Sequence, residues 1–365
     1  SVQAACCGTW DTAVIAGLDQ RGEAPVPFLN ILMEPMAGGY GARPDTDGMD
    51  TGGLFCIPMG RVPDTEMSEF LYPMLVLWRR EEADSGGPGR TRGGVSASMA
   101  ITPYGTQVPM GLVLASAGKA VAQNTGLAGG YPGNTGLELV ARDADVLSAL
   151  AAGRIPTAMD EVGGRLEIGQ NYSTLAVNPG EVLFMHWQGG GGYGDPLTRE
   201  VSAIQRDIDA EKITPQGAFV SYGAVVVDGR VDADATQARR AEVRAERARG
   251  GDGTGSVELA DITDARHINS ALVQVGNGTG AKVACSHCGE VLATVGADET
   301  LRLQRVDSAP TTAGPQITAV ASDYVDREVV FRQYCCPGCW TTSWSGLVPT
   351  DHPDYAVELG LLQSV

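Results

Sequence analysis

Two short cysteine motifs near the end of the chain constrain its fold more than any other feature. Cys285 and Cys288 stand in A-C-S-H-C-G, and Cys336 and Cys339 stand in C-C-P-G-C-W. Each C-x-x-C pair can supply two thiolates from one tight turn, and Zn²⁺ takes four such ligands in a tetrahedron. The spacing therefore predicts a closed four-thiolate zinc site, which is typical of a structural metal. The alternative is a set of reduced structural thiols without a metal.

The cysteine count and the charge of the chain limit the cellular compartments and the kinds of partner that we expect for it. Eight cysteines include the adjacent pairs Cys6-Cys7 and Cys335-Cys336. Adjacent cysteines rarely bond to each other, and a thiolate site needs reduced sulfur, so the cytoplasm is favoured over a disulfide scaffold. A net charge of −18 opposes binding to nucleic acid phosphates. No apolar run is long enough to cross a membrane, so we expect neither nucleic acid nor a membrane as a partner.

Two domains are expected, because 365 residues exceed what one small core usually organises. Residues 1–249 are rich in glycine, and their short apolar runs, such as 108–114 and 181–185, are broken by turn residues. This pattern predicts short strands and long loops. Helical spacing of apolar residues occurs at 66–78 and 199–210. The larger domain is therefore expected to be α+β, with helices and loop-rich mixed sheets.

A charged, alanine-rich segment closes the larger domain. Residues 231–249 predict a solvated surface helix, with an Arg-rich binding helix as the alternative. A glycine-rich stretch at 250–256 follows and is the expected linker. Residues 257–365 contain both cysteine motifs, with strand-like runs at 291–295 and 327–334 between them. A cysteine pair, a few strands and a second cysteine pair predict a small β-rich zinc-ribbon domain.

Four glycine-rich stretches are where a ligand is most expected. Residues 188–199 contain four consecutive glycines, which allow close approach of a ligand or of another backbone. No Lys-Ser or Lys-Thr pair follows, so the stretch is not a phosphate loop. A structural turn and a substrate-lining loop are equal alternatives here. The other stretches, at 38–48, 84–94 and 129–136, combine glycine with arginine or aspartate.

Polar residues of these stretches are the candidate site residues. Arg43, Arg90 and Arg92 could hold a carboxylate or a phosphate through paired hydrogen bonds. Alternatively they fix the loops by pairing with the nearby aspartates, which are Asp45, Asp47 and Asp84. His186, just before the four glycines, is a further candidate for a catalytic or ligand residue. His287, between the first two cysteines, is expected to be exposed or to lie beside the metal.

The chain lacks a complete catalytic constellation of side chains. Cys6 and Cys7 stand in no local pattern that would lower the pKa of a thiol, so we expect them to be core thiols. The chain starts at Ser1 without a methionine, and we expect a fragment or a processed chain. These features together predict a subunit whose chemistry is completed by another chain.

The glycine motifs resemble, in their order, those of the hydantoinase B/oxoprolinase family. That order is G-G-Y-G-A-R-P-D-T-D-G, E-M-S-E-F-L-Y-P, D-S-G-G-P-G-R-T-R-G-G, G-G-Y-P-G-N, G-G-G-G-Y-G-D-P and Y-G-A-V-V. The resemblance covers residues 1–249 and matches only the C-terminal half of that family's subunit. It implies that the N-terminal half, with Asn-Asp-Pro and His-x-x-Asp motifs linked to a divalent metal, lies on another chain or was cut away. No catalytic metal ligand is assigned here.

The tail resembles the small zinc subunit of acetone carboxylase, although Trp340 stands where a glycine is usual. The combination points to the ATP-dependent ketone carboxylases. It implies a hydantoinase-A-like partner that binds ATP and activates ketone and bicarbonate by phosphorylation, with ATP and a divalent metal in partner chains. Arg43 and Arg92 would then lie near the anionic groups derived from a small ketone. The alternatives are ATP-dependent hydrolysis of a cyclic amide, as in hydantoinase or 5-oxoprolinase, and a scaffold without catalytic residues.

Overall fold

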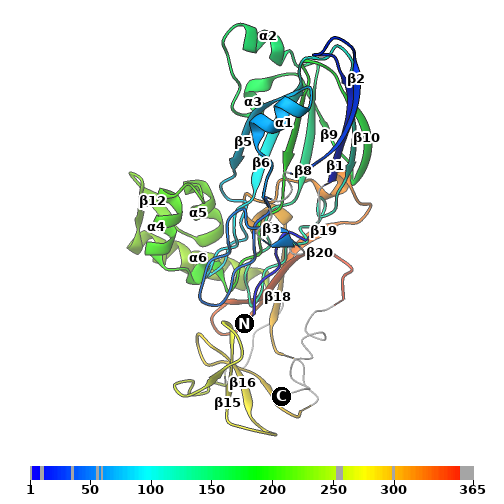
Figure 1. Cartoon of the computed structure of the whole chain (residues 1–365). Coiled ribbons are helices and arrows are strands. Elements are labelled where there is room, and N and C mark those ends of the chain that lie inside the picture. Colours follow the sequence, from blue (N-terminus) through cyan, green and yellow to red (C-terminus); the bar gives the residue numbers. More distant parts are fainter. Residues whose placement is uncertain are drawn as a thin grey trace.

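The structure is a computed structural model that describes residues 2–8, 12–33, 37–54, 57–58, 61–251, 258–297 and 301–353. Two stacked sheets form the upper part of the molecule in Figure 1, and a group of helices projects from one side. Of the small sheets from the last third of the chain, the one with β19 (Val329–Cys335) and β20 (Thr342–Pro349) lies at mid-height and the one with β15 (Leu272–Val275) and β16 (Lys282–Cys285) lies at the lower end. The predicted α+β class is confirmed. One detail differs from the prediction. Mixed sheets were expected, whereas the ladders between the described strands are antiparallel.

The first sheet has four strands in the order β10-β7-β1-β2. Its inward residues, such as Ile15 and Leu112, belong to the main hydrophobic core between the two sheets. The strand predicted within 108–114 is present as β7. The strands are β1 (Thr12–Asp19), β2 (Val26–Leu32), β7 (Met110–Ala115) and β10 (Tyr172–Val177).

The second sheet has five strands in the order β5-β6-β11-β8-β9. Met99 and Leu183 point from it into the main core, and Trp78 and Phe184 belong to a second cluster on its other side. Residues of α2 and α3 pack against that cluster and cover the outer face. The elements are β5 (Met74–Glu81), β6 (Ala97–Pro103), β8 (Leu137–Arg142), β9 (Arg165–Ile168), β11 (Val182–His186), α2 (Val146–Ala151) and α3 (Met159–Val162).

The outer face of the first sheet is apolar as well, which is unusual for an antiparallel sheet. Leu29 is 70% exposed and Tyr172 is 71% exposed, so the described residues leave this face uncovered. Cross-strand neighbours continue the apolar surface, since Ala16 pairs with Leu29 and Val14 pairs with Ile31. The outward positions of the described strands carry no charge and are Thr12, Val14, Ala16, Leu18, Pro27, Leu29, Ile31, Gly111, Val113, Ala115, Tyr172, Thr174 and Ala176.

The helix predicted at 66–78 is wrong in its second half. Helix α1 (Thr65–Leu71) starts where the Asp64 side chain accepts a hydrogen bond from the Met67 N–H. It ends at Tyr72, whose ψ of 146° is extended. The next residue is proline, which disfavours a helical conformation in the residue before it. The chain then enters β5, and the apolar residues that suggested a helix belong to a strand.

Along the chain, the group of projecting helices comes after the last strand of the second sheet. It contains two of the predicted helices. The helix predicted at 199–210 is α4, and the one predicted at 231–249 is α6. Helix α6 is not wholly solvated as predicted, because Arg240 and Arg247 on it are buried. The elements are α4 (Val201–Asp209), α5 (Pro215–Tyr222), β12 (Val225–Val227), β13 (Arg230–Asp232) and α6 (Ala233–Gly250), with a 3₁₀ turn at Pro196–Thr198.

The four glycine-rich stretches pack backbone against backbone beneath the sheets. The Gly190 N–H donates to Gly94 O at 2.9 Å, and the Gly94 N–H donates to Tyr40 O at 2.8 Å. A Cβ atom added at Gly190 would overlap the Tyr40 carbonyl, and one added at Gly192 would overlap that of Pro88. Glycine is required here by these close approaches. Of the two alternatives for the four-glycine run, the structural one accounts for its contacts.

The last third of the chain forms two small sheets, in the orders β14-β15-β16-β17 and β18-β19-β20. The second of them packs on the glycine stretches, because Phe331 and Leu347 share a core cluster with Tyr131. Of the expected linker, Gly250 ends α6, and residues 252–256 lie outside the described residues. The strands are β14 (Arg266–His267), β15 (Leu272–Val275), β16 (Lys282–Cys285), β17 (Val291–Thr294), β18 (Gln304–Ser308), β19 (Val329–Cys335) and β20 (Thr342–Pro349).

Short elements complete the description. A two-stranded ladder joins β3 (Gly53–Leu54) to β4 (Ile57–Pro58), and 3₁₀ turns occur at Pro310–Ala313 and Ala321–Asp323. Within the described ranges, no helix has both the length and the apolar character that a membrane span requires.

Candidate metal centre

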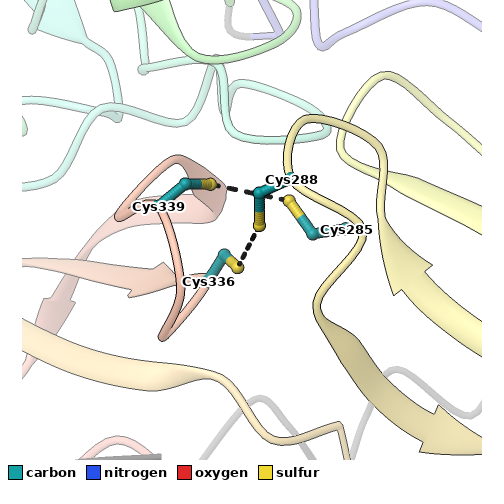
Figure 2. A group of neighbouring side chains, drawn as sticks. All are labelled: Cys285, Cys288, Cys336 and Cys339. Atoms are coloured by element: carbon teal, nitrogen blue, oxygen red, sulfur yellow. Dashed lines mark hydrogen bonds between the residues drawn. The ribbon is translucent and has the colours of Figure 1, made fainter. Parts of the chain in front are cut away.

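The four predicted cysteines converge on one point between the two small sheets. The sulfur atoms of Cys285, Cys288, Cys336 and Cys339 all lie within 4.8 Å of one another. Figure 2 shows that two come from each of two facing turns. The Sγ atoms of Cys285 and Cys339 are 3.7 Å apart, and those of Cys288 and Cys336 are 3.6 Å apart. A disulfide would require about 2.05 Å, so these residues are free thiols.

The cluster fits a tetrahedral metal ion. Zn–S bonds of about 2.3 Å place the sulfurs of a tetrahedron about 3.8 Å apart, close to both measured separations. Four sulfurs so close together cannot all be thiolates without a cation between them. The mutual hydrogen bonds of the four thiols raise the pKa of Cys285 and Cys336 and lower the pKa of Cys288 and Cys339. A bound cation would therefore displace protons from the cluster.

The two turns have the same backbone design but different residues at one position. In the first turn the Gly289 N–H donates to Cys285 O at 2.9 Å, and in the second the Trp340 N–H donates to Cys336 O at 2.9 Å. The residue after each second cysteine is left-handed, with φ of 78° at Gly289 and 58° at Trp340. A Cβ at Gly289 would lie 2.5 Å from the Ala260 carbonyl oxygen, so glycine is required there.

Trp340 occupies its left-handed position with support from helix α6. A left-handed conformation costs an L-residue about 1–2 kcal/mol. The indole ring packs on Gly251, where any side chain would overlap it. The Trp340 carbonyl accepts a hydrogen bond from Arg247 Nη1 at 2.9 Å. These contacts offset the backbone cost and attach the second cysteine turn to the end of α6.

Arg247 forms a buried ion pair that joins three segments. Its Nη1 atom lies 2.6 Å from Asp195 Oδ2, and both side chains are buried. Asp195 also accepts hydrogen bonds from the Thr342 N–H at 2.7 Å and the Leu197 N–H at 2.8 Å. Arg247 Nη2 donates to the Tyr131 hydroxyl at 2.8 Å. The pair thus ties the glycine stretches and α6 to the first residue of β20.

The ionisation of this pair is set by two opposing effects. Burial alone would raise the pKa of Asp195, but Arg247 and the hydrogen bonds from Thr342 and Leu197 outweigh it and lower the pKa below its usual value. A lowered folded-state pKa means that the charged pair stabilises the fold at neutral pH. That contribution is lost as the pH falls below the unfolded-state value and through the folded-state pKa.

The candidate arginines occupy different environments. Arg92 is buried and forms ion pairs with Asp50 at 2.8 Å and Asp207 at 3.4 Å. Its Nη1 also donates to Gly93 O at 2.6 Å, so its charge is matched within the chain. Arg43 is exposed, and in the described part of the chain its side chain makes no ion pair. Arg90 is exposed and donates from Nη2 to Pro44 O at 2.7 Å.

Neither candidate histidine belongs to the cysteine cluster. His186 is the last residue of β11, and its Nε2 lies 3.4 Å from both Ser96 Oγ and Asn134 Nδ2. Burial lowers the pKa of His186 to about 4, so the ring is neutral at physiological pH. His287 is exposed and is not one of the metal-binding group, as predicted.

A buried network around Arg199 was missed from the sequence. Arg199 lies 2.8 Å from Asp47 and 2.7 Å from Asp207, and Asp207 also pairs with Arg92. Asp47 was considered as a partner for a loop arginine, but Asp207 was not. Arg199 and Asp207 are only 8 positions apart. The pairs of Arg199 with Asp47 and of Arg92 with Asp207 span 152 and 115 positions, so no local spacing could have indicated the network.

The sandwich, the glycine stretches and the cysteine cluster define an α+β protein with a β module that carries four convergent cysteines. Residues 1–196 match the hydantoinase B/oxoprolinase family, and the chain belongs to that family.

Characterised relatives are enzyme subunits. The chain is 34% identical over 252 residues to the acetophenone carboxylase delta subunit of Aromatoleum aromaticum, covering 65% of this chain and 36% of that one. It is 29% identical over 234 residues to caprolactamase subunit beta of Pseudomonas jessenii, covering 62% and 36%. It is 28% identical over 233 residues to the acetone carboxylase alpha subunit of Xanthobacter autotrophicus, covering 59% and 30%. The chain therefore spans about a third of the length of these relatives.

Solved structures show the same relationship. A nucleotide-free structure of acetone carboxylase superposes with a TM-score of 0.60 at 25% identity, covering 67% of this chain and 34% of that one. The ATP-dependent caprolactamase of Pseudomonas jessenii superposes with a TM-score of 0.53 at 27% identity, covering 66% and 38%.

The cysteine cluster predicts one bound divalent metal ion per chain. Elemental analysis of protein purified without chelator should find stoichiometric zinc. Cys288→Ser should weaken zinc binding by more than about 100-fold, since even supporting groups of such sites contribute 10–100-fold. Cys6→Ser, outside the cluster, should leave the zinc content unchanged. Absence of stoichiometric metal from both the unmodified chain and Cys6→Ser would contradict the assignment.

The buried pair predicts a large effect of one substitution on α6. Arg247→Met should lower the free energy of unfolding by about 3–5 kcal/mol, because it leaves the Asp195 carboxylate buried without its cation. Arg249→Met, at an exposed position of the same helix, should change it by less than about 0.5 kcal/mol. Urea unfolding of the two variants measures the difference, and equal effects would show that the pair is unimportant.

Proposed function

We propose that this chain is a subunit of an ATP-dependent ketone carboxylase. The observation that carries the proposal is the 34% identity over 252 residues to a subunit of acetophenone carboxylase. The likeness to an acetone carboxylase structure supports the same reaction class. The scarcity of catalytic side chains agrees with a subunit that completes a site rather than one that acts alone.

The tail is proposed to be a zinc module that braces the assembly. Residues 1–249 and 257–365 would be two domains, with Zn²⁺ held by Cys285, Cys288, Cys336 and Cys339. All four positions of the tetrahedron are taken by sulfur, which leaves no open position for a substrate. The ion would therefore fix the two turns rather than act on a substrate. The ion pair of Arg247 with Asp195 connects this module to the glycine stretches.

Two protein partners are proposed. One is a hydantoinase-A-like subunit that binds ATP, with its divalent metal. The other is a chain carrying the N-terminal half of a hydantoinase B subunit, since the relatives are about three times longer than the match. The uncovered apolar face of the first sheet supports the second partner. An exposed apolar surface that continues across four strands without a charge is typical of a protein interface, and we propose that the N-terminal half covers it.

In the proposed reaction the ATP-binding partner phosphorylates the enol oxygen of the ketone and bicarbonate. Carboxyphosphate releases CO₂ and phosphate, and the nucleophilic carbon of the enol phosphate attacks CO₂ to form the new C–C bond. The attack leaves the phosphoryl group on the carbonyl oxygen, and water cleaves that O–P bond, which leaves a 3-oxo acid and a second phosphate. Exclusion of bulk water would protect both phosphorylated intermediates. The glycine stretches would form part of this enclosure.

Arg43 is the better placed of the two arginine candidates for the anionic intermediates. Its guanidinium is exposed and forms no ion pair within the described residues. Arg92 is already matched by Asp50 and Asp207. Arg43→Ala in the assembled complex should therefore reduce turnover without affecting assembly, whereas Arg92 is proposed to hold the loops together.

A second reaction is favoured by a specific relative. The chain is 29% identical to caprolactamase subunit beta. It superposes with a TM-score of 0.53 on the structure of the ATP-dependent caprolactamase. The chain would then serve ATP-dependent opening of a cyclic amide. A third possibility is a scaffold without catalytic residues.

An assay of ATP hydrolysis by the native complex separates these functions. We expect hydrolysis that requires both a ketone and bicarbonate. Hydrolysis that needs a lactam or hydantoin, but not bicarbonate, would instead establish the cyclic amide reaction. A scaffold predicts that Arg43→Ala leaves turnover unchanged.

The apolar face predicts that a charge on it prevents assembly. Leu29→Glu should weaken binding of the N-terminal half by more than tenfold, because the carboxylate would be buried without a partner. Leu29 is 70% exposed, so the isolated chain should unfold at an unchanged denaturant concentration. Arg154→Glu, on the exposed loop after α2, serves as the control. Size-exclusion chromatography of the mixed chains provides the measurement, and unchanged assembly of Leu29→Glu would refute the interface.

A further inference from the structure

Arg240 on helix α6 is a buried cation without a carboxylate partner. Arg240 is only 8% exposed. Nε donates to Tyr222 O at 3.1 Å and Nη2 donates to Arg199 O at 2.7 Å. In the described part of the chain, no carboxylate lies within ion-pair distance of it, and Nη1 has no acceptor. A buried charge is costly unless an opposite charge compensates it.

The N-terminus of helix α4 offers unsatisfied donors beside this cation. The helix has nine residues, and Glu200 at its start makes no side-chain capping hydrogen bond. The N–H groups of Ala203 and Ile204 are satisfied by the Glu200 carbonyl. Those of Val201 and Ser202 have no acceptor among the described residues. Free N–H groups at a helix N-terminus carry partial positive charge and favour an anion.

Both features line one open pocket of about 490 Å³. Arg230, whose side chain is 78% exposed, lines it too, and its ion pair with Asp209 is long at 3.9 Å. The charge of Arg199 is already matched by Asp47 and Asp207. Glu200 is the one acidic residue among the described lining residues, and it is exposed. Among the charged side chains that line the pocket, three arginines therefore face one carboxylate.

We propose that this pocket is a binding site for a phosphate group, of inorganic phosphate or of a small phosphomonoester. The oxygens would accept hydrogen bonds from the Val201 and Ser202 N–H groups, the Ser202 hydroxyl and Arg240 Nη1. Arg230 adds a second positive charge at the opening. Several donors converge from different directions, which suits a tetrahedral group with three free oxygens better than a flat carboxylate. The site does not depend on the proposed carboxylase function.

Isothermal titration calorimetry of the full chain with inorganic phosphate tests the site, with glycerol phosphate as the phosphomonoester and acetate as the carboxylate. We expect saturable binding of one phosphate per chain, and weaker binding of acetate. If only glycerol phosphate binds, the ligand is a monoester rather than the free ion. Failure of both phosphates to bind would overturn the proposal, whatever reaction the complex catalyses.

Substitutions at exposed lining residues place the binding in this pocket. Arg230→Gln should weaken phosphate binding at least threefold, and Glu200→Gln should strengthen it, because each changes one charge at the opening. Arg249→Gln, exposed on α6, is the matched control and should have no effect. Arg240→Gln should abolish binding if the variant folds. Binding that is insensitive to both Arg230→Gln and Glu200→Gln would rule out this pocket.

Discussion

The buried ion pair between Arg247 and Asp195 is the contact on which the arrangement of this chain depends. Asp195 directly follows the last glycine of the stretch 188–199, and Arg247 lies in the last turn of α6. Because Asp195 also accepts the Thr342 N–H, the same carboxylate fixes the start of β20. The second cysteine turn immediately precedes that strand. One ion pair therefore sets where two of the four sulfurs lie relative to the body of the protein.

The glycine stretches explain why so few side chains suggest a reaction. Where segments approach as closely as Gly190 approaches Tyr40, no side chain fits between them. Backbone N–H and C=O groups join these segments by hydrogen bonds to one another, as between Gly94 and Tyr40. Such a region gives rigidity without reactive groups. The charge of Arg92, which lies within one of these stretches, is matched by Asp50.

Local sequence patterns predicted local structure, but they did not predict the contacts between residues that are far apart in the chain. The cysteine spacing predicted the cluster, and helical spacing predicted α4, because both signals lie within a few residues. The helix expected through residue 78 failed where Pro73 redirects the chain into β5, since the apolar residues there suit either element. Arg240 and Arg247 looked like solvated helix residues, because their partners lie far away in sequence. The role of Arg92 likewise depends on Asp207, which no nearby spacing indicates.

The left-handed backbone of Trp340 has a consequence for how such four-cysteine modules are recognised in sequences. A search pattern that insists on glycine after the second cysteine of each turn would reject this sequence, although the backbone here has the required shape. What is needed is a left-handed residue together with something to compensate its strain, and here the end of a neighbouring helix supplies the compensation. Related modules that lack this helix should keep glycine at the position. Those that retain the helix are free to use a large aromatic residue instead.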